Sequence, residues 1–274
     1  MKIVTIARDV SHSPNMAAND AAILGCVTDE LRAKGLQVIE ATGAELPDDC
    51  VAVCHMSRSP EVLKILKEAV RRGVTVINTP AAVENCSRLK MMHKMKVAGI
   101  KQPPYCLIDE RTPLESLRYP AWLKRADGWS THCDDVCFVR NADEAKEAFD
   151  NMVGRGITGV VHCEHVAGDI VKFYGVGKSF FRHIYPDPEK SKFGLEKINE
   201  TPHRYPFSLD EMKRTVFSAA ESIGLEIYGG DCIVCEDGAI YIIDMNDFPS
   251  FSAIRDEAAG EIAEYIINRI NEER

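Results

Sequence analysis

Residues Ala239–Phe251 read AIYIIDMNDFPSF, and this stretch decides how the rest of the chain is interpreted. An apolar strand pattern, IYII at 240–243, runs directly into the polar sequence DMND at 244–247. The preceding segment, 226–238, reads EIYGGDCIVCEDG and ends in a strong signal for a two-residue hairpin turn, Asp237-Gly238. The stretch therefore predicts the second arm of a β-hairpin that ends in a cluster of oxygen-bearing side chains.

A turn at Asp237-Gly238 would place Asp231 opposite Asp244 on the neighbouring strand, with Asn246 on the same face. Two carboxylates about 5 Å apart repel each other by about 3 kcal/mol at an effective dielectric near 20. A cation is the natural compensation, and Mg²⁺ held by carboxylates and nucleotide phosphates fits best, with Mn²⁺ as a second candidate. The alternative is that the two aspartates are hydrated residues at exposed strand ends.

The composition excludes several classes of protein. The chain has 274 residues, 45% hydrophobic and 27% charged, which is typical of a globular protein with more than one lobe. A net charge of -9 without a basic stripe argues against a nucleic-acid partner. No segment approaches the roughly 18 apolar residues of a membrane span, so we expect a cytoplasmic protein. The oligomeric state is left open.

Strand and helix patterns alternate over residues 1–79, which predicts a three-layer α/β lobe. The proline-guided sequence KQPPYCLID at 101–109 is interpreted as the entry into a second lobe. A long polar segment, 184–208, is interpreted as a substrate or lid loop, with a plain surface excursion as the alternative.

With the acidic hairpin in place, the chain resembles the ATP-grasp superfamily, in particular ribosomal-protein glutamate ligases and glutathione synthetases. The resemblance covers nearly the whole chain and lies in the order and spacing of four segments: 76–104, WLKRADGWSTH at 122–132, VVHCEHV at 160–166 and DMNDFP at 244–249. It implies an N-terminal three-layer α/β lobe (1–79) followed by two α+β lobes (80–165 and 166–274) that clasp the nucleotide. It also implies ATP and Mg²⁺ as cofactors.

The same resemblance assigns roles to individual residues. Lys90 and Lys124 would contact the nucleotide phosphates as point charges, and Gly128 would lie in the loop that covers those phosphates. The adenine contacts would fall at Glu164, His165 and Val166, and the metal ligands would be Asp231, Asp244 and Asn246.

Two reactions fit this resemblance. Most ATP-grasp enzymes are ligases, which phosphorylate a carboxylate and let an amine attack the acyl phosphate. Asp244 stands where ligases usually carry Glu, and together with ADGWSTH and VKFYGVG it resembles the inositol trisphosphate 5/6-kinases, which implies that His132 and Lys172 contact a substrate phosphate. We expect the ligase, in which Lys124 also acts in catalysis, with the kinase as the main alternative. A third possibility is a module that binds ATP without chemistry.

The substrate is expected to be a small anion, since polar and cationic residues lie in loops and at strand ends where it could bind. Ser11 and Asn15 follow the first strand, where open α/β sheets bind ligands. Ser250 takes the place of the glycine in the kinases' Phe-Pro-Gly turn. The cationic candidates are Arg182 and Arg255, together with Arg8, His12, Arg58 and His183. The alternative is that most of these are ordinary surface charges.

Overall fold

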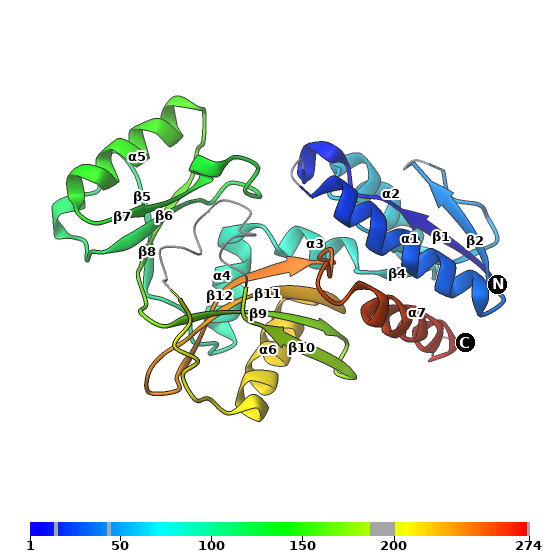
Figure 1. Ribbon diagram of the computed structural model, residues 1–274. Helices are drawn as coiled ribbons and strands as arrows, with labels where there is room; N and C mark the ends of the chain where they lie inside the picture. The colour runs from blue at the N-terminus through cyan, green and yellow to red at the C-terminus, as the bar shows by residue number, and fades with distance from the viewer. Residues whose placement is uncertain (14–15, 43–44, 187–200, 273–274) are drawn as a thin grey trace.

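The computed structural model describes residues 1–13, 16–42, 45–186 and 201–272. In these residues the chain forms three four-stranded sheets, which follow one another along the sequence and carry helices on their faces (Figure 1). The mixed α/β class predicted from the sequence is confirmed. Among the described helices, none combines the length and the apolar character needed to cross a bilayer.

The first sheet is parallel and has the order β2-β1-β3-β4, formed by β1 (Lys2–Ile6), β2 (Gln37–Ala41), β3 (Cys50–His55) and β4 (Thr75–Ile77). Its helices α1 (Ala17–Ala33) and α2 (Pro60–Arg71) lie on opposite faces. Successive residues of a strand point to opposite faces of the sheet, so the contacts of Ile3 and Val4 in β1 show this. Ile3 packs in a cluster with Ile23 of α1, whereas Val4 packs with Val62 of α2. The predicted three-layer arrangement is therefore present.

The second sheet has the order β5-β8-β6-β7 and antiparallel pairing throughout: β5 (Tyr105–Ile108), β6 (Ala121–Arg125), β7 (Val136–Val139) and β8 (Val160–Glu164). Helix α5 (Ala142–Gly154) covers one face, where Phe149 and Met152 pack against Leu123. Asn141 caps this helix by accepting a hydrogen bond from the Glu144 N–H at 2.9 Å. Two short 3-10 helices, Leu114–Ser116 and Cys133–Asp135, flank β6 and β7.

The third sheet is also antiparallel, with the order β10-β9-β11-β12: β9 (Asp169–Val176), β10 (Phe180–Ile184), β11 (Ile227–Val234) and β12 (Ile240–Asp247). Helices α4 (Arg88–Val97) and α6 (Leu209–Ile223) share one apolar cluster with it, in which Met91 and Val216 meet Phe173. Ser208 caps helix α6 by accepting a hydrogen bond from the Glu211 N–H at 3.2 Å, and the helix ends before Gly224, whose φ of 89° suits a residue without a side chain.

Two helices tie these sheets together. The short α3 (Pro80–Asn85) leads from β4 into α4. The last helix, α7 (Arg255–Glu272), returns to the first sheet and lies beside α1 (Figure 1). Its Ile262 and Ile266 share one apolar cluster with Ile3 of β1 and Phe248, which follows β12. The first and third sheets therefore share a core, whereas the predicted lobe boundaries at 79/80 and 165/166 stay predictions.

The β11–β12 hairpin confirms one predicted pair and corrects the predicted turn. Asp231 lies opposite Asp244 as expected, but Ile233 pairs with Tyr241, whereas a two-residue turn at Asp237-Gly238 would pair it with Ile242. The turn holds three residues between Cys235 and Ala239: the Cys235 N–H donates to the Ala239 carbonyl at 2.9 Å. A register shift beside Asp231 leaves Ile243 unpaired and restores the offset. The extra residue in the turn and the extra residue at the register shift therefore cancel, so Asp231 still lies opposite Asp244.

Candidate active site

A cavity of about 360 Å³ lies where the three sheets approach one another. Its lining comes from the loops after β1 and β3, from the start of α4, from β6 and β8, and from the ends of β9, β11 and β12. The volume is within the range of small-molecule sites. Many of the lining side chains are charged, and they fall into four groups along the cavity.

The first group is the acidic end of the β11–β12 hairpin. Asn246 donates its side-chain N–H to Asp244 Oδ2 at 3.1 Å. Each aspartate has a cationic neighbour: Lys172 Nζ lies 3.0 Å from Asp231 Oδ1, and Arg88 Nη1 lies 3.8 Å from Asp244 Oδ1. The predicted ligand set is therefore assembled on one side of the cavity.

These three residues fit a hard divalent cation. Asp231 and Asp244 keep 21% and 32% of their side-chain surface exposed, so their oxygens can be reached from the cavity. Asn246 uses its amide nitrogen on Asp244, which leaves its own oxygen for another partner. Carboxylate and amide oxygens are the donors that Mg²⁺ takes in proteins.

The second group consists of cations beside the acidic pair. Lys124 on β6 and Lys172 on β9 line the cavity, as does Arg88, the first residue of α4. Arg88 Nε donates to the Arg125 carbonyl at 2.9 Å, which fixes the direction of its guanidinium. Burial lowers the pKa of the Lys124 ammonium, and the positive charge of Arg88 acts in the same direction.

The third group is the end of β8, where the adenine contacts were predicted. Glu164, His165 and Val166 all line the cavity. The backbone N–H of Glu164 donates to the Pro104 carbonyl at 2.9 Å, and that of His165 donates to the Pro120 carbonyl at 3.0 Å. Trp122 Nε1 donates to His165 Nδ1 at 3.1 Å. Burial lowers the pKa of His165, so its ring is neutral at physiological pH.

The fourth group is a buried ion cluster at the opposite end. Arg58 Nε lies 2.9 Å from Asp247 Oδ1, and Arg8 Nη1 lies 3.2 Å from Asp247 Oδ2. Arg8 Nε also lies 3.1 Å from Asp20 Oδ2. Burial alone would raise the pKa of Asp247, but the charges of Arg58 and Arg8 outweigh it and hold that pKa below its ordinary value. The cluster joins the loops after β1 and β3 to the end of β12.

Between these groups the loop from β6 to β7 carries Gly128 over the cavity. Buried Asp135 orders this loop, since its Oδ2 accepts hydrogen bonds from the backbone N–H groups of Thr131 at 2.8 Å and His132 at 3.0 Å. Arg155 Nη1 holds the other carboxylate oxygen of Asp135 at 2.8 Å. Asp127, directly before Gly128, accepts hydrogen bonds from the Thr158 N–H at 2.9 Å and from Arg125 Nε at 2.6 Å, so the loop is anchored on both sides of Gly128.

The fold of the chain is found in many solved structures, although no family model and no curated protein matches its sequence. A D-alanine–D-alanine ligase from Bacillus anthracis superposes with a TM-score of 0.72 at 12% identity, over 99% of this chain and 98% of the other. A RimK-domain ATP-grasp protein from Sphaerobacter thermophilus gives 0.68 at 16% identity, over 97% and 100%. The ATP-grasp ligase PsnB, bound to a minimal precursor, gives 0.66 at 17% identity, over 97% and 98%.

The chain has the ATP-grasp fold. The fold implied by the resemblance is therefore confirmed. One structure of the B. anthracis ligase is a complex with ATP, and one of PsnB contains Mg and ADP. These ligands are bound in the similar structures.

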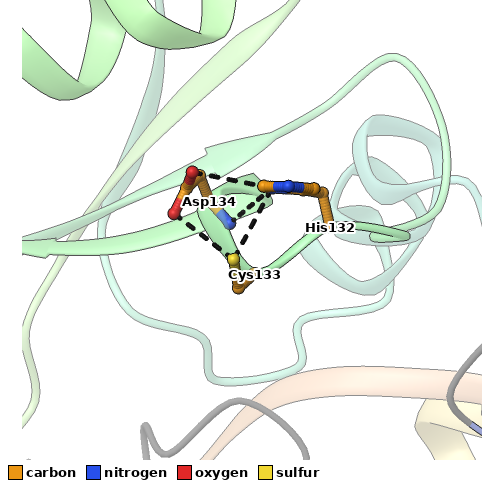
Figure 2. A group of neighbouring side chains, drawn as sticks. All are labelled: His132, Cys133 and Asp134. Carbon is orange, nitrogen blue, oxygen red and sulfur yellow. Dashed lines mark hydrogen bonds and ion pairs between the residues drawn. The ribbon is translucent and has the colours of Figure 1, made fainter.

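In this ATP-grasp fold, two predicted contacts do not reach the cavity. Lys90 is exposed on α4 and is absent from the described residues that line the cavity, where Arg88 lies instead. His132 is also outside the lining, with 54% of its side chain exposed. Its Nδ1 accepts the Asp134 N–H at 3.2 Å and lies 3.6 Å from Cys133 Sγ (Figure 2). The ring is thus turned toward its own loop.

Several predicted substrate residues also lie elsewhere. Arg182 on β10 forms an ion pair with Glu257 of α7, and Arg255 Nη2 donates to Asn19 Oδ1 at 2.9 Å. Neither lines the cavity, and the same holds for Ser11 and Ser250. Asn15 lies outside the described residues, as does most of the predicted loop (187–200).

Sequence reasoning missed three features of this ATP-grasp cavity. Arg88 carries a usable signal, because it directly follows Ser87, a residue type that favours helix N-termini and that takes the N-cap position of α4. Asp247 belongs to the acidic sequence at 244–247, but its pairing with Arg8 and Arg58 joins residues far apart in sequence, which no local pattern predicts. Trp129 also lines the cavity, and a single aromatic residue in a loop has no spacing that would predict this.

Proposed function

We propose that the protein is an ATP-dependent ligase that phosphorylates the carboxylate of a small acidic substrate and joins the acyl group to an amine. The observation that carries the proposal is one cavity in which Arg88, Lys124 and Lys172 face the set of Asp231, Asp244 and Asn246. Cations beside hard oxygen ligands are what a Mg²⁺-bound triphosphate requires. The ATP-grasp fold of known ligases supports the same reading.

In this proposal the nucleotide lies along the cavity. The base would bind at Glu164–Val166, and the phosphates would extend toward Lys124, Lys172 and Arg88. Asp231, Asp244 and Asn246 would hold Mg²⁺, which supplies positive charge to the triphosphate when bound. The carboxylate substrate would then lie beyond the γ-phosphate, toward Arg8 and Arg58.

The chain's own residues would do most of the work by positioning and charge. The lysines and Arg88 would draw the phosphate oxygens into line with the attacking carboxylate oxygen, because phosphoryl transfer depends mainly on alignment and electrostatic stabilisation. Lys124 is half-buried, so water screens its charge less than at the surface, and its attraction for phosphate is correspondingly stronger. The amine would attack the acyl carbon and release phosphate.

A phosphotransferase acting on a hydroxyl is the second candidate. Asp244 in place of Glu and the presence of Lys172 in the cavity favour it. The ring of His132, its other predicted phosphate contact, is turned toward Cys133 and Asp134 (Figure 2). The ligase is therefore the better supported of the two.

Calorimetric titration with Mg-ATP tests nucleotide binding. Asp244→Asn and Lys124→Ala should each weaken binding at least about tenfold, which corresponds to about 1.4 kcal/mol. The control is Asp237→Asn, an exposed residue of the same hairpin whose hydrogen bond to the Ala239 N–H an asparagine can keep. Unchanged binding in both site variants would exclude an ATP site here.

Phosphorus NMR then separates the two reactions. ATP is incubated with panels of carboxylic acids and polyols, each with and without an amine such as alanine. The ligase should release inorganic phosphate only when an acid and an amine are both present. A stable phosphate ester on a polyol would show that the kinase alternative is correct.

A further inference from the structure

Trp129 connects two parts of the molecule that face each other across the cavity. It follows Gly128 in the loop between β6 and β7, and it lines the cavity. Its indole ring lies 5.0 Å from Arg58 Cζ, in a cation–π arrangement. The ring of His12 also meets it edge-on, with the ring centroids 6.1 Å apart and an interplanar angle of 88°. A residue of the second sheet's loop thus docks on the loops after β1 and β3.

The cation beneath the ring is held in place from the other side. Arg58 contacts Asp247 through Nε at 2.9 Å and Nη2 at 2.5 Å, and Asp247 ends the strand that carries Asp244 and Asn246. The docked indole therefore rests on a platform that is fixed to the acidic hairpin. Through Trp129, the loop between β6 and β7 is therefore connected to the first sheet and to the strand that carries Asp244 and Asn246.

The docked position is opposed by an unsatisfied donor. Trp129 Nε1 is buried, and none of the described residues accepts its hydrogen. A buried N–H without an acceptor disfavours the docked state, whereas the contacts with Arg58 and His12 favour it. Because these effects oppose each other, the unpaired N–H reduces the free energy by which the docked ring is favoured, so a ligand beneath the loop can decide between the two states.

We propose that Trp129 is a gate for the substrate half of the cavity, which docks between His12 and Arg58 when a nucleotide occupies the phosphate half. Phosphates beneath Gly128 would hold the loop down, and the docked indole would close the space beside Arg8 and Arg58 against solvent. The inference rests on the proposed function, because it requires that the cavity binds a nucleotide. It adds the residue that links nucleotide binding to closure over the substrate.

The chain contains two tryptophans, Trp122 and Trp129, so single-tryptophan proteins can test the gate. In Trp122→Phe, the fluorescence of Trp129 is measured under acrylamide quenching with and without Mg-AMP-PNP. We expect the quenching constant to fall at least about twofold on nucleotide binding, because the docked ring is shielded. Adding His12→Ala to this protein should abolish the protection, since the edge contact is lost.

The reciprocal protein, Trp129→Phe, leaves Trp122, which is hydrogen-bonded to His165 at the other end of the cavity. Calorimetry on both single-tryptophan proteins establishes that they bind Mg-AMP-PNP. If both bind it and the quenching of Trp129 stays unchanged, the gate is wrong while the proposed nucleotide site stands. If neither they nor the parent protein binds it, both the gate and the proposed function fail.

Discussion

Arg88 and Lys90 lie two residues apart on α4, and the helix directs their side chains to different surroundings. Arg88 begins α4 and directs its guanidinium to the Arg125 carbonyl, Ser130 Oγ and Asp244. Residues two apart on an α-helix point about 200° away from each other, so Lys90 faces solvent when Arg88 faces the cavity. The resemblance implies a phosphate contact at Lys90, whereas the residue of this helix turn that lines the cavity is Arg88, two residues earlier.

Replacing these two cations gives the prediction at this scale. Arg88→Ala should weaken Mg-ATP binding at least about tenfold, because a partly buried positive charge beside Asp244 is lost. Lys90→Ala is the matched control on the same helix and should change the dissociation constant less than about twofold. Calorimetry measures both, and an equal loss in the two variants would contradict the assignment.

At the scale of elements, the close packing of the β11–β12 hairpin requires a glycine at position 230, because a side chain there would overlap its neighbours. A Cβ on Gly230 would overlap the Asp244 carbonyl oxygen and would lie 2.6 Å from Phe173 Cζ. Gly230→Ala should therefore destabilise the protein by about 1 to 3 kcal/mol, as overpacking does, and should shift Asp231 and Asp244 apart. Urea unfolding measures the stability, and calorimetry with Mg-ATP measures the loss of the site.

Gly25 in α1 is the control for this substitution, since no heavy atom lies within 4 Å of a Cβ built there. Gly25→Ala should stabilise the protein by up to about 1 kcal/mol, because alanine is the better helix former. Should Gly230→Ala match it in stability and in Mg-ATP binding, the close packing of β11 against β12 would not be what positions the acidic pair.

The same hairpin separates what the sequence could predict from what it could not. Alternating apolar residues and the Asp237-Gly238 signal sufficed to place two strands and a turn. The length of the turn and the unpaired Ile243 could not be read from the pattern, because β11 is also paired with β9, where Asp231 lies opposite Lys172. The predicted pairing of Asp231 with Asp244 is nevertheless correct, because the longer turn and the register shift compensate each other.

At the scale of the whole molecule, buried titratable groups lie between the first and third sheets. Asp247 bridges Arg8 and Arg58, and its pKa is held below its ordinary value, so its contribution to stability is present throughout the range above about pH 4. His55, at the end of β3, is 1% exposed, and its Nε2 lies 2.7 Å from the Asn78 carbonyl oxygen. These pairings depend on tertiary packing, which sequence periodicity does not report.

His55 determines how stability should respond to acid. Burial lowers its pKa from 6.5 to about 4. An unfolded chain therefore takes up a proton on this ring below about pH 6.5, while the folded chain does so only near pH 4, so stability falls as the pH falls through this window. Between about pH 7 and pH 4.5 the loss from this residue should be about 2 to 3 kcal/mol. Burial lowers the pKa values of His162, His165 and His183 as well, and these residues add to the loss with the same sign.

Urea unfolding of the parent protein and of His55→Gln at the two pH values isolates this contribution. Glutamine does not titrate, so the variant should lose less stability on acidification than the parent, whatever its stability at neutral pH. His93→Gln is the control, because His93 is exposed on α4, and it should keep the parental pH dependence. An acid response in His55→Gln as steep as that of the parent would show that the imidazole of His55 is not the group that destabilises the shared core when it gains a proton.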